Sequence, residues 1–364
     1  EFRAGVALFD APSQNLVYAD VDGNIGYQTP GLIPVRPAAN DGLWPVDGST
    51  DEYEWLGYIP YDDLPRVLNP ERGYIQTANQ AVVPLEYYET LNARLSETYG
   101  QPVNAVIGTD WAQGYRGQRI AELLEATEIH SIDTFKTIQG DNKAVYAQEM
   151  MPFISAVDYG SDSLNDMRDW LAQWDFMANA DSAPAALFNV FYAHLMNELF
   201  DDQTDDLITV GTGSAHAVAR LMSLPDNAWW DDVRTADTTE TRDDILKRAF
   251  ASAVEDTQAR LGTDRSKWQW GTLHQANFIS EVMGNSGISI IEGLFNRMGT
   301  GVGGGGEIVN ATGWNAGDED YTLRALPSFR MIVDMSNLDN SVNIHTTGQS
   351  SHPFSEFYDN MIPL

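Results

Sequence analysis

The stretch LVYADVDGNIGY, residues 16–27, contains the clearest local signal for the fold. Two short runs of β-forming residues flank a polar segment that contains Asp-Gly-Asn, and this pattern predicts an antiparallel hairpin. Asp20, Asp22 and Asn24 also have the spacing of the first ligands of an EF-hand calcium loop. Such a loop needs glycine at its sixth position and glutamate at its twelfth, where this chain has Ile25 and Gly31. The segment is therefore predicted to be a hairpin and not a calcium loop.

Beyond the hairpin, the first hundred residues are rich in strand and turn signals. Glycine, proline, tryptophan and tyrosine are frequent in residues 31–70, which predicts a long ordered loop packed by aromatic side chains. A short strand is predicted over 73–79, after an Asn-Pro turn.

Helical spacing dominates the middle of the chain, from about residue 113 to 260. One amphipathic helix is predicted to begin with Ser163 as its cap, and another covers 241–261. Short segments return towards the end, where residues 329–335 predict a strand. This β–α–β order predicts an α+β fold in a single interleaved domain over 1–364, not alternating βα units.

The composition excludes several classes of partner. The chain has 364 residues, with 53 Asp and Glu against 21 Lys and Arg, and a net charge of −32. Nucleic acid and anionic membranes both attract basic surfaces, so neither is an expected partner. The absence of cysteine excludes disulfides, thiolate metal sites and a cysteine nucleophile. No apolar run is long enough to span a membrane, and no signal peptide is recognisable. Both ends of the chain look cut, so we expect a piece of a longer or processed polypeptide.

Familiar chemical motifs are missing. The six histidines lack the spacing of a zinc site, and the glycine cluster over 299–306 lacks the Gly-Lys-Ser/Thr ending of a phosphate loop. No GxSxG nucleophile elbow occurs. The adjacent acids Asp201-Asp202 and Asp205-Asp206 are interpreted as a solvated face. Composition and spacing alone therefore do not identify an active site.

Several stretches resemble one family when they are taken together and in order. They are the segments 12–27, 31–36, 55–60, 69–79, 114–120, 174–175, 181–182, 268–274, 330–334 and 348–350. This ordered set is similar to the β chain of the penicillin acylases (penicillin amidases), which are N-terminal-nucleophile hydrolases. The resemblance implies an αββα sandwich with helical elaborations. It also implies a precursor that cleaves itself into an α chain and a β chain, the latter beginning with the nucleophilic serine.

The resemblance assigns roles to two residues. Asn79 resembles the oxyanion-hole asparagine, and Arg116 resembles the arginine that orients it near the nucleophile. The nucleophile itself has no counterpart in this chain, because Glu1 is not a serine and Ser13 lies in an interior strand motif. Family members also bind a structural calcium, for which Glu86 and the backbone carbonyl of Gly42 are at loosely equivalent positions.

Two departures from the family pattern lie near the expected site. The chain has Gln80 where many relatives have a second asparagine after Asn79. An insertion that includes residues 91–106 separates Glu86 from Arg116, and we expect it to reshape the substrate pocket.

The resemblance implies an amidohydrolase that cleaves a linear amide through an acyl-enzyme on a serine outside this chain, so the fragment alone is expected to be inactive. Its substrate would be a small N-acyl compound, such as an acylated β-lactam nucleus of antibiotic metabolism, an acyl-homoserine lactone or another N-acyl amine. No catalytic cofactor is expected. The partners would be the α chain and the rest of the β chain, in the periplasm or outside the cell. The alternative is a non-catalytic binding or structural protein on the same scaffold.

Overall fold

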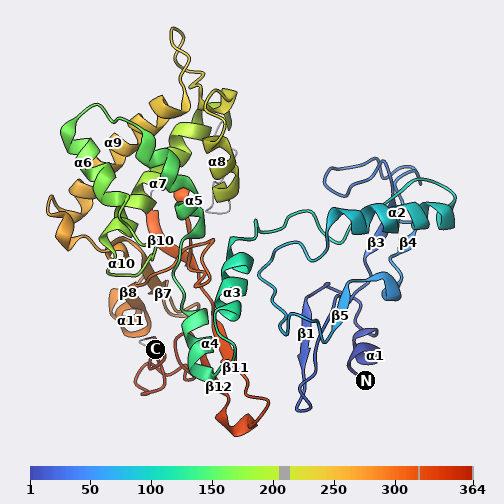
Figure 1. Ribbon diagram of the computed structural model, residues 1–364. Helices are drawn as coiled ribbons and strands as arrows, with labels where there is room; N and C mark the ends of the chain where they lie inside the picture. Colours follow the sequence, from blue (N-terminus) through green and yellow to red (C-terminus); the bar gives the residue numbers. More distant parts are fainter. Residues whose placement is uncertain (205–213, 319, 363–364) are drawn as a thin grey trace. The chain divides into compact units, whose positions relative to one another are not determined.

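The computed structural model describes residues 1–204, 214–318 and 320–362 (Figure 1). Asp205 and Asp206 of the expected solvated face lie outside these residues. Two compact units are present, the first formed by Glu1–Leu124 with Asp334–Asn340 and the second by Glu125–Val333 with Ser341–Leu364. The single domain expected over 1–364 stays a prediction, and each unit is described by itself.

The predicted hairpin is confirmed in the first unit. Strands β1 (Leu16–Ala19) and β2 (Ile25–Gln28) pair antiparallel, with Val17 opposite Tyr27. Asp20 closes the turn, because its Oδ1 accepts hydrogen bonds from the backbone N–H groups of Asp22 at 3.0 Å and Asn24 at 2.9 Å. This is an Asx-type turn, in which the carboxylate replaces a backbone acceptor.

The first unit also contains the third strand of the hairpin sheet, a second three-stranded sheet and three helices. Its helices are α1 (Phe2–Val6), α2 (Leu85–Tyr99) and α3 (Tyr115–Glu125), with a 3₁₀ turn at Tyr61–Asp63. Its other strands are β3 (Pro34–Pro37), β4 (Gly57–Tyr58), β5 (Arg66–Leu68) and β6 (Val103–Ala105). The strand orders are β1-β2-β5 in one sheet and β4-β3-β6 in the other.

The prediction of a loop over 31–70 is wrong in part, because this segment contains β3, β4 and β5. Val35 of β3 is fully buried and pairs with Ala105 of β6. Both come from segments in which the sequence showed little periodicity. The prolines at the two ends of β3 concealed a strand that is only four residues long.

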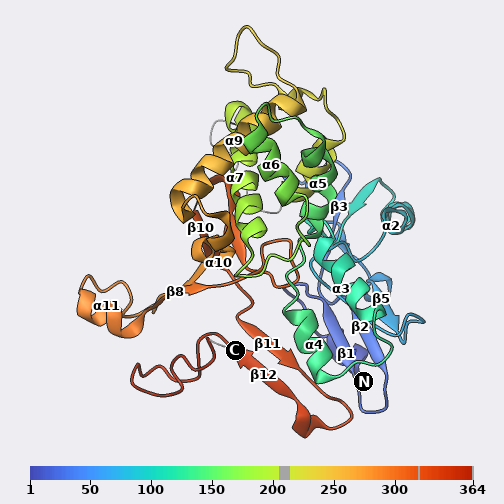
Figure 2. The same cartoon turned by 60° about the vertical axis from the view of Figure 1, so that its left-hand side comes forward.

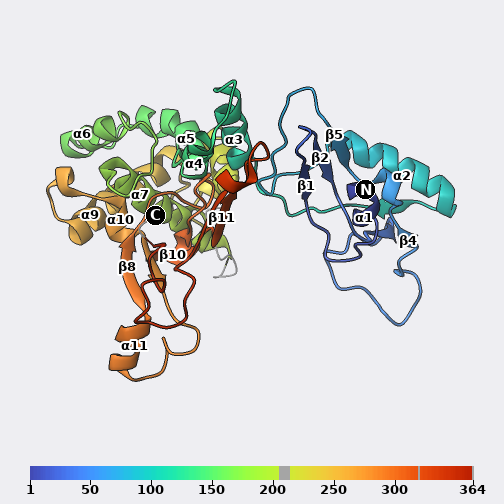
Figure 3. The same cartoon turned by 90° about the horizontal axis from the view of Figure 1, so that it is seen from below.

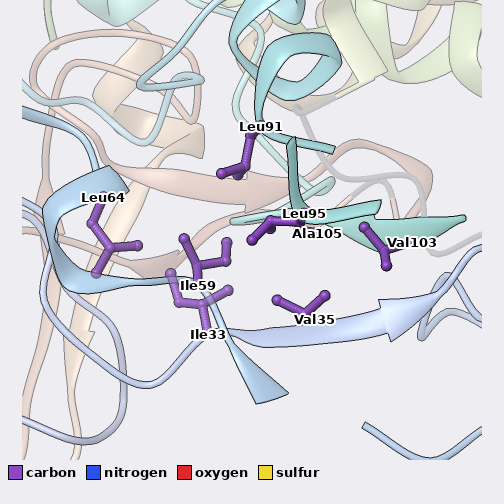
Figure 4. Packing of buried hydrophobic residues seen from close by; sticks show 8 residues of the cluster. All are labelled: Ile33, Val35, Ile59, Leu64, Leu91, Leu95, Val103 and Ala105. Carbon is purple, nitrogen blue, oxygen red and sulfur yellow. The ribbon is translucent and has the colours of Figure 1, made fainter. Parts of the chain in front are cut away.

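A compact apolar core explains the insertion at 91–106. Figure 4 shows side chains of the β4-β3-β6 sheet and of α2 pointing towards one another. The cluster consists of Ile33, Val35, Ile59, Leu64, Leu91, Leu95, Val103 and Ala105. Half of these side chains come from the insertion, which therefore supplies the helix and the strand that complete this core.

Helices dominate the second unit, as the apolar spacing predicts (Figure 1). They are α4 (Ile132–Gln139), α5 (Val145–Ala156), α6 (Asp162–Leu171), α7 (Ala183–Thr204), α8 (Ala215–Met222), α9 (Arg242–Leu261), α10 (Trp270–Leu273) and α11 (Ser289–Phe295). The predicted helix at 241–261 is confirmed as α9, which packs along α7 through buried residues such as Phe191 and Phe250. Short 3₁₀ turns lie at Ala228–Trp230, Arg265–Lys267 and Ala316–Asp318, and a further one at Leu338–Asn340 belongs to the first unit.

The cap predicted for α6 is wrong by two residues. Ser161, not Ser163, has extended backbone angles and accepts a hydrogen bond from the Leu164 N–H at 3.2 Å. Both serines precede the apolar run, so sequence alone favours neither position strongly. Ser163 lies inside the first turn of the helix.

Short antiparallel pairs complete the second unit. They are β7 (Gln275–Phe278) with β8 (Arg297–Gly301), β9 (Gly313–Asn315) with β10 (Asp320–Ala325), and β11 (Phe329–Ile332) with β12 (Val342–His345). Figures 2 and 3 show α11 at the far end of the β7–β8 pair, away from α7 and α9. The strand predicted over 329–335 is confirmed as β11, although it ends at Ile332.

Charged side chains lie mainly at the surface of both units. Asp201 contacts Arg234 at 3.2 Å, and the Asp202 carboxylate accepts a hydrogen bond from the Val233 N–H. Within the described ranges, no helix is long and apolar enough to cross a membrane.

Candidate active site

Asn79 lies in the segment between β5 and α2, at the position where a strand over 73–79 was predicted. That prediction is wrong, because no strand forms there and Asn79 has a left-handed φ of 65°. Asparagine tolerates this conformation better than other residues with a Cβ atom. The carbonyl of Asn79 accepts a hydrogen bond from the Ala112 N–H at 2.9 Å, so the turn is tied to the segment that leads into α3.

Arg116 fixes the orientation of the Asn79 side chain. It lies in the first turn of α3, and its Nη2 donates a hydrogen bond to Asn79 Oδ1 at 2.8 Å. A guanidinium can only donate, so the amide oxygen must face Arg116 and the amide nitrogen must face away. The Asn79 side chain is exposed, and no described residue accepts a hydrogen bond from its Nδ2. Two N–H donors are thus presented in a fixed direction.

Gln80 holds the same turn from the other side. Its Oε1 accepts a hydrogen bond from the Ala78 N–H at 2.7 Å, which spans Asn79. Its amide packs against Gly117, where an added Cβ would lie 3.2 Å from Gln80 Cδ and Oε1. Because Gly117 follows Arg116, the residue that packs on Gln80 is adjacent to the residue that holds Asn79.

A pocket of about 570 Å³ adjoins this turn. Thr77 and Gln80, which flank Asn79, contribute to its wall. The other lining residues are Tyr27, Asp62, Asp63, Leu64, Pro65, Arg66, Val67, Arg72, Ile75, Gln76, Ala81, Val82, Val83 and Tyr87. No residue of the insertion at 91–106 belongs to this wall, and only Tyr87 comes from α2.

Tyr87 is neutral in this wall at ordinary pH. Burial, followed by the nearby Asp63 carboxylate, raises the pKa of its phenol to about 12. Its hydroxyl donates a hydrogen bond to the carbonyl of Asp63 at 2.7 Å. The pocket therefore combines neutral, apolar and charged surface, which suits an amphipathic small molecule.

The two residues suggested for calcium both lie in exposed segments of the first unit. Glu86 is exposed at the start of α2, whereas Gly42 lies in an exposed segment beside the Arg36 guanidinium, whose Cζ would be 3.1 Å from an added Cβ. Calcium takes six to eight oxygen ligands, and a neighbouring cation opposes its binding. No group of three or more His, Cys, Asp and Glu side chains gathers for a metal among the described residues. The expected structural calcium stays a prediction.

Ser13 and His274 both make contacts that stabilise the fold. Ser13 Oγ donates a hydrogen bond to the carbonyl of Pro30 at 2.7 Å and so braces the hairpin. His274 is fully buried, stacks on Trp270 with a centroid distance of 4.6 Å, and lies with Nδ1 2.7 Å from the carbonyl of Tyr321. Desolvation lowers the pKa of His274 to about 4.

Comparison with known proteins shows which fold the chain has and to which family it belongs. The fold matches that of the thermostable penicillin G acylase from Alcaligenes faecalis, with a TM-score of 0.59 and 16% identity over 100% of this chain and 64% of that chain. The predicted α+β fold is thereby confirmed as the fold of a penicillin acylase. A family model for penicillin amidase matches residues 1–364, so the chain belongs to the penicillin amidase family.

Two similar proteins illustrate two kinds of acylase. The acyl-homoserine lactone acylase QuiP of Pseudomonas syringae pv. tomato is 30% identical over 96% of this chain. The penicillin acylase 2 proenzyme of a Pseudomonas species is 29% identical over 94% of this chain. In both cases the chain spans 42% of the relative's own length.

The structure thus brings Asn79 and Arg116 together, while their catalytic roles stay predictions. The positioning contacts of Gln80 were missed, since the sequence showed only that it departs from the family pattern. A glutamine directly after a strained asparagine is the signal that could have suggested them, because its side chain is long enough to reach back over one residue.

Proposed function

We propose that the complete protein, of which this chain is a part, hydrolyses the linear amide bond of a small N-acyl compound. The observation that carries the proposal is the exposed Asn79 amide, whose oxygen is held by Arg116 at 2.8 Å. Membership of the penicillin amidase family supports amide hydrolysis in general. The names of the relatives support an acyl compound as the substrate, either an acyl-homoserine lactone or a penicillin.

In the proposed reaction, the nucleophile is the amino-terminal serine of a processed chain and lies outside these 364 residues. Its own α-amine, with a pKa of about 7.7–8.0, takes the hydroxyl proton as the oxygen attacks the amide carbonyl. The carbonyl oxygen becomes an anion, and the Nδ2 group of Asn79 donates a hydrogen bond to it. The intermediate then expels the amine, which takes the proton, and leaves an acyl ester on the serine. Water hydrolyses the ester by the same steps and releases the carboxylic acid.

Arg116 acts as a positioning residue in this proposal. If the Asn79 amide turned over, its oxygen would face the developing anion and repel it. The bond from Arg116 opposes that rotation. The fixed direction of the Nδ2 donors means that little reorganisation is needed when the charge develops.

The proposal includes the partners that the precursor would supply. These are the α chain and the remainder of the β chain, produced by self-cleavage, and this chain alone is then expected to be inactive. That the chain spans 42% of its relatives' length supports the presence of other parts. A periplasmic or secreted location is proposed on the family resemblance alone, and cell fractionation would test it.

The test is an assay of the complete precursor, expressed from its whole gene and checked for cleavage by mass spectrometry. It is incubated separately with an N-acyl-homoserine lactone and with a penicillin. We expect release of a primary amine and a carboxylic acid in equal amounts from at least one of them. A cleaved and folded protein that releases amine from neither substrate would overturn the proposal and favour the non-catalytic alternative.

A further inference from the structure

Arg330 is a half-buried cation without an acidic partner among the described residues. It lies on β11, opposite Ile344 of β12, and its Nη2 donates a hydrogen bond to Asn310 Oδ1 at 2.6 Å. No carboxylate of the described residues pairs with it. Arg248, by contrast, contacts the three carboxylates of Glu198, Asp232 and Glu240.

A series of side-chain amides orients the Arg330 guanidinium. Asn310 accepts from Arg330 and donates from Nδ2 to Asn142 Oδ1 at 3.0 Å. Asn142 in turn donates to Asn179 Oδ1 at 2.9 Å. The amides of Asn310 and Asn142 are each fixed at both ends, so the guanidinium is held in place by neutral groups. Most of its five N–H donors stay available, and burial leaves its charge only partly solvated.

Arg330 lines two pockets, and among the described residues neither pocket has an aspartate or glutamate in its wall. The smaller, of about 150 Å³, is also lined by Thr300, Thr312 and His345 together with apolar side chains. The larger, of about 330 Å³, is also lined by Lys136, Gln139 and Asn343. Lys136 forms only an exposed contact with Asp133 at 3.5 Å. In a chain with 53 acidic residues, two cations around acid-free cavities form an unusual surface.

We propose that Arg330 is the centre of a binding site for a carboxylate. The planar guanidinium matches a carboxylate in two parallel hydrogen bonds, and such bonds are stronger than those between neutral groups. Thr300, whose hydroxyl forms no hydrogen bond with the described residues, supplies a hydroxyl donor in the smaller pocket. Lys136 adds positive charge at the larger one.

This carboxylate has two chemically equivalent sources. It can belong to a free organic acid, or it can be an aspartate or glutamate side chain of the polypeptide outside this chain. All residues that line the two pockets at Arg330 belong to the second unit, whereas Asn79 belongs to the first.

The first experiment titrates the 364-residue chain with sodium acetate, while the ¹⁵N resonance of Arg330 Nε is followed by NMR. Sodium chloride at equal ionic strength corrects for screening. We expect a saturable shift with a dissociation constant on the order of millimolar, as befits so small a ligand. A response that does not saturate, or that chloride reproduces, would overturn the proposal.

Variants assign the binding to the guanidinium, with acetate binding followed through the amide resonances of Thr300 and His345. Arg330→Gln should abolish binding, and Arg330→Lys should weaken it at least fivefold, because lysine keeps the charge without the fork. Arg324→Gln is the matched control, since Arg324 is exposed and already paired with Asp320 at 3.0 Å. If Arg330→Gln fails to fold, Arg330→Lys decides alone. Unchanged acetate affinity in either folded variant would contradict the proposal.

Repeating the titration on the complete precursor separates the two sources. Acetate binding that persists there identifies a free organic acid as the ligand. Loss of acetate binding, with Arg330→Gln lowering the melting temperature by several degrees more than Arg324→Gln, identifies a side chain of the rest of the polypeptide. Loss of acetate binding without that extra destabilisation would overturn the proposal for the complete protein.

Discussion

Arg116 donates a hydrogen bond from Nη2 to Oδ1 of Asn79 at 2.8 Å, between residues that are 37 positions apart in the chain. The contact joins the first turn of α3 to a left-handed residue in the segment between β5 and α2. It settles which end of the Asn79 amide faces outward, because a guanidinium cannot accept a hydrogen bond. The proposed reaction depends on that direction.

Shortening the donor at Arg116 should impair the reaction more than it impairs substrate binding. Arg116→Lys in the complete enzyme keeps the charge but loses the planar fork that holds Asn79 Oδ1. We expect kcat to fall by about 10- to 100-fold while KM changes little, because the lost interaction matters mainly in the transition state. Steady-state kinetics measure both constants.

Arg324→Lys provides the matched control for this substitution. Arg324 is exposed and pairs with Asp318 and Asp320, and none of the three contributes to the Asn79 turn. Its kinetics should equal those of the unmodified enzyme. Equal kinetics of Arg116→Lys and Arg324→Lys would show that Arg116 does not orient Asn79.

The side chain of Gln80 should be needed to keep the Asn79 turn rigid. Gln80→Met has a similar length but cannot accept the hydrogen bond from the Ala78 N–H, whereas Gln80→Glu still can. We expect Gln80→Met to cost about 1 kcal/mol of unfolding free energy and to lower kcat several-fold. Urea unfolding and kinetics measure these effects. If Gln80→Glu loses as much as Gln80→Met, the hydrogen bond is not the relevant interaction.

Buried His274 should make the chain less stable in acid. Its pKa in the folded state is about 4, below the ordinary value of about 6.5. Between pH 6.5 and 4 the unfolded chain therefore binds a proton that the folded chain does not. The stability contribution is complete above pH 6.5 and is lost as the pH falls towards 4, by an amount on the order of 3 kcal/mol. Urea unfolding at several pH values measures this loss.

Other groups also titrate in this range, so a comparison of variants isolates His274. His274→Gln should flatten the pH dependence between 6.5 and 4. His352→Gln, at an exposed histidine, is the matched control. Parallel pH profiles for the unmodified chain and His274→Gln would show that His274 does not titrate as described.

The corrected cap of α6 can be tested by a pair of identical substitutions. Ser161→Ala removes the acceptor of the Leu164 N–H and should cost about 1 kcal/mol. Ser163 is the second residue of the helix, and Ser163→Ala should change the unfolding free energy by no more than about 0.5 kcal/mol. Thermal or urea unfolding distinguishes them. The opposite ranking would restore Ser163 as the cap.

Residue propensity and apolar spacing predicted those parts of the fold whose structure is determined within one short segment of the chain. The hairpin around Asp20 and the long helix after Thr241 are of this kind, and both are confirmed. Strand β3 is different, because Val35 is stabilised by Ala105, which is 70 positions away and lies in an apparent insertion. Propensity and periodicity cannot report pairing at such a distance.

The candidate active site around Asn79 was even harder to predict from sequence propensity and periodicity. No motif in the sequence sets Asn79 apart from other asparagines, and only the family resemblance suggested it together with Arg116. The left-handed turn that presents Asn79 depends on contacts with Ala112 and Gln80, so a strand was predicted there instead. Such a turn follows from tertiary hydrogen bonds, which override the local preference for an extended chain.

The central claim is that the Asn79 amide stabilises the oxyanion, and kcat of the complete enzyme with Asn79→Ala and Asn79→Gly tests it most directly. Glycine keeps the left-handed turn without strain and alanine does not, but both lack the donor. We expect kcat to fall by roughly 10²–10³ in both variants, with intact folding and cleavage. A kcat within about twofold of the unmodified enzyme in Asn79→Gly would contradict it.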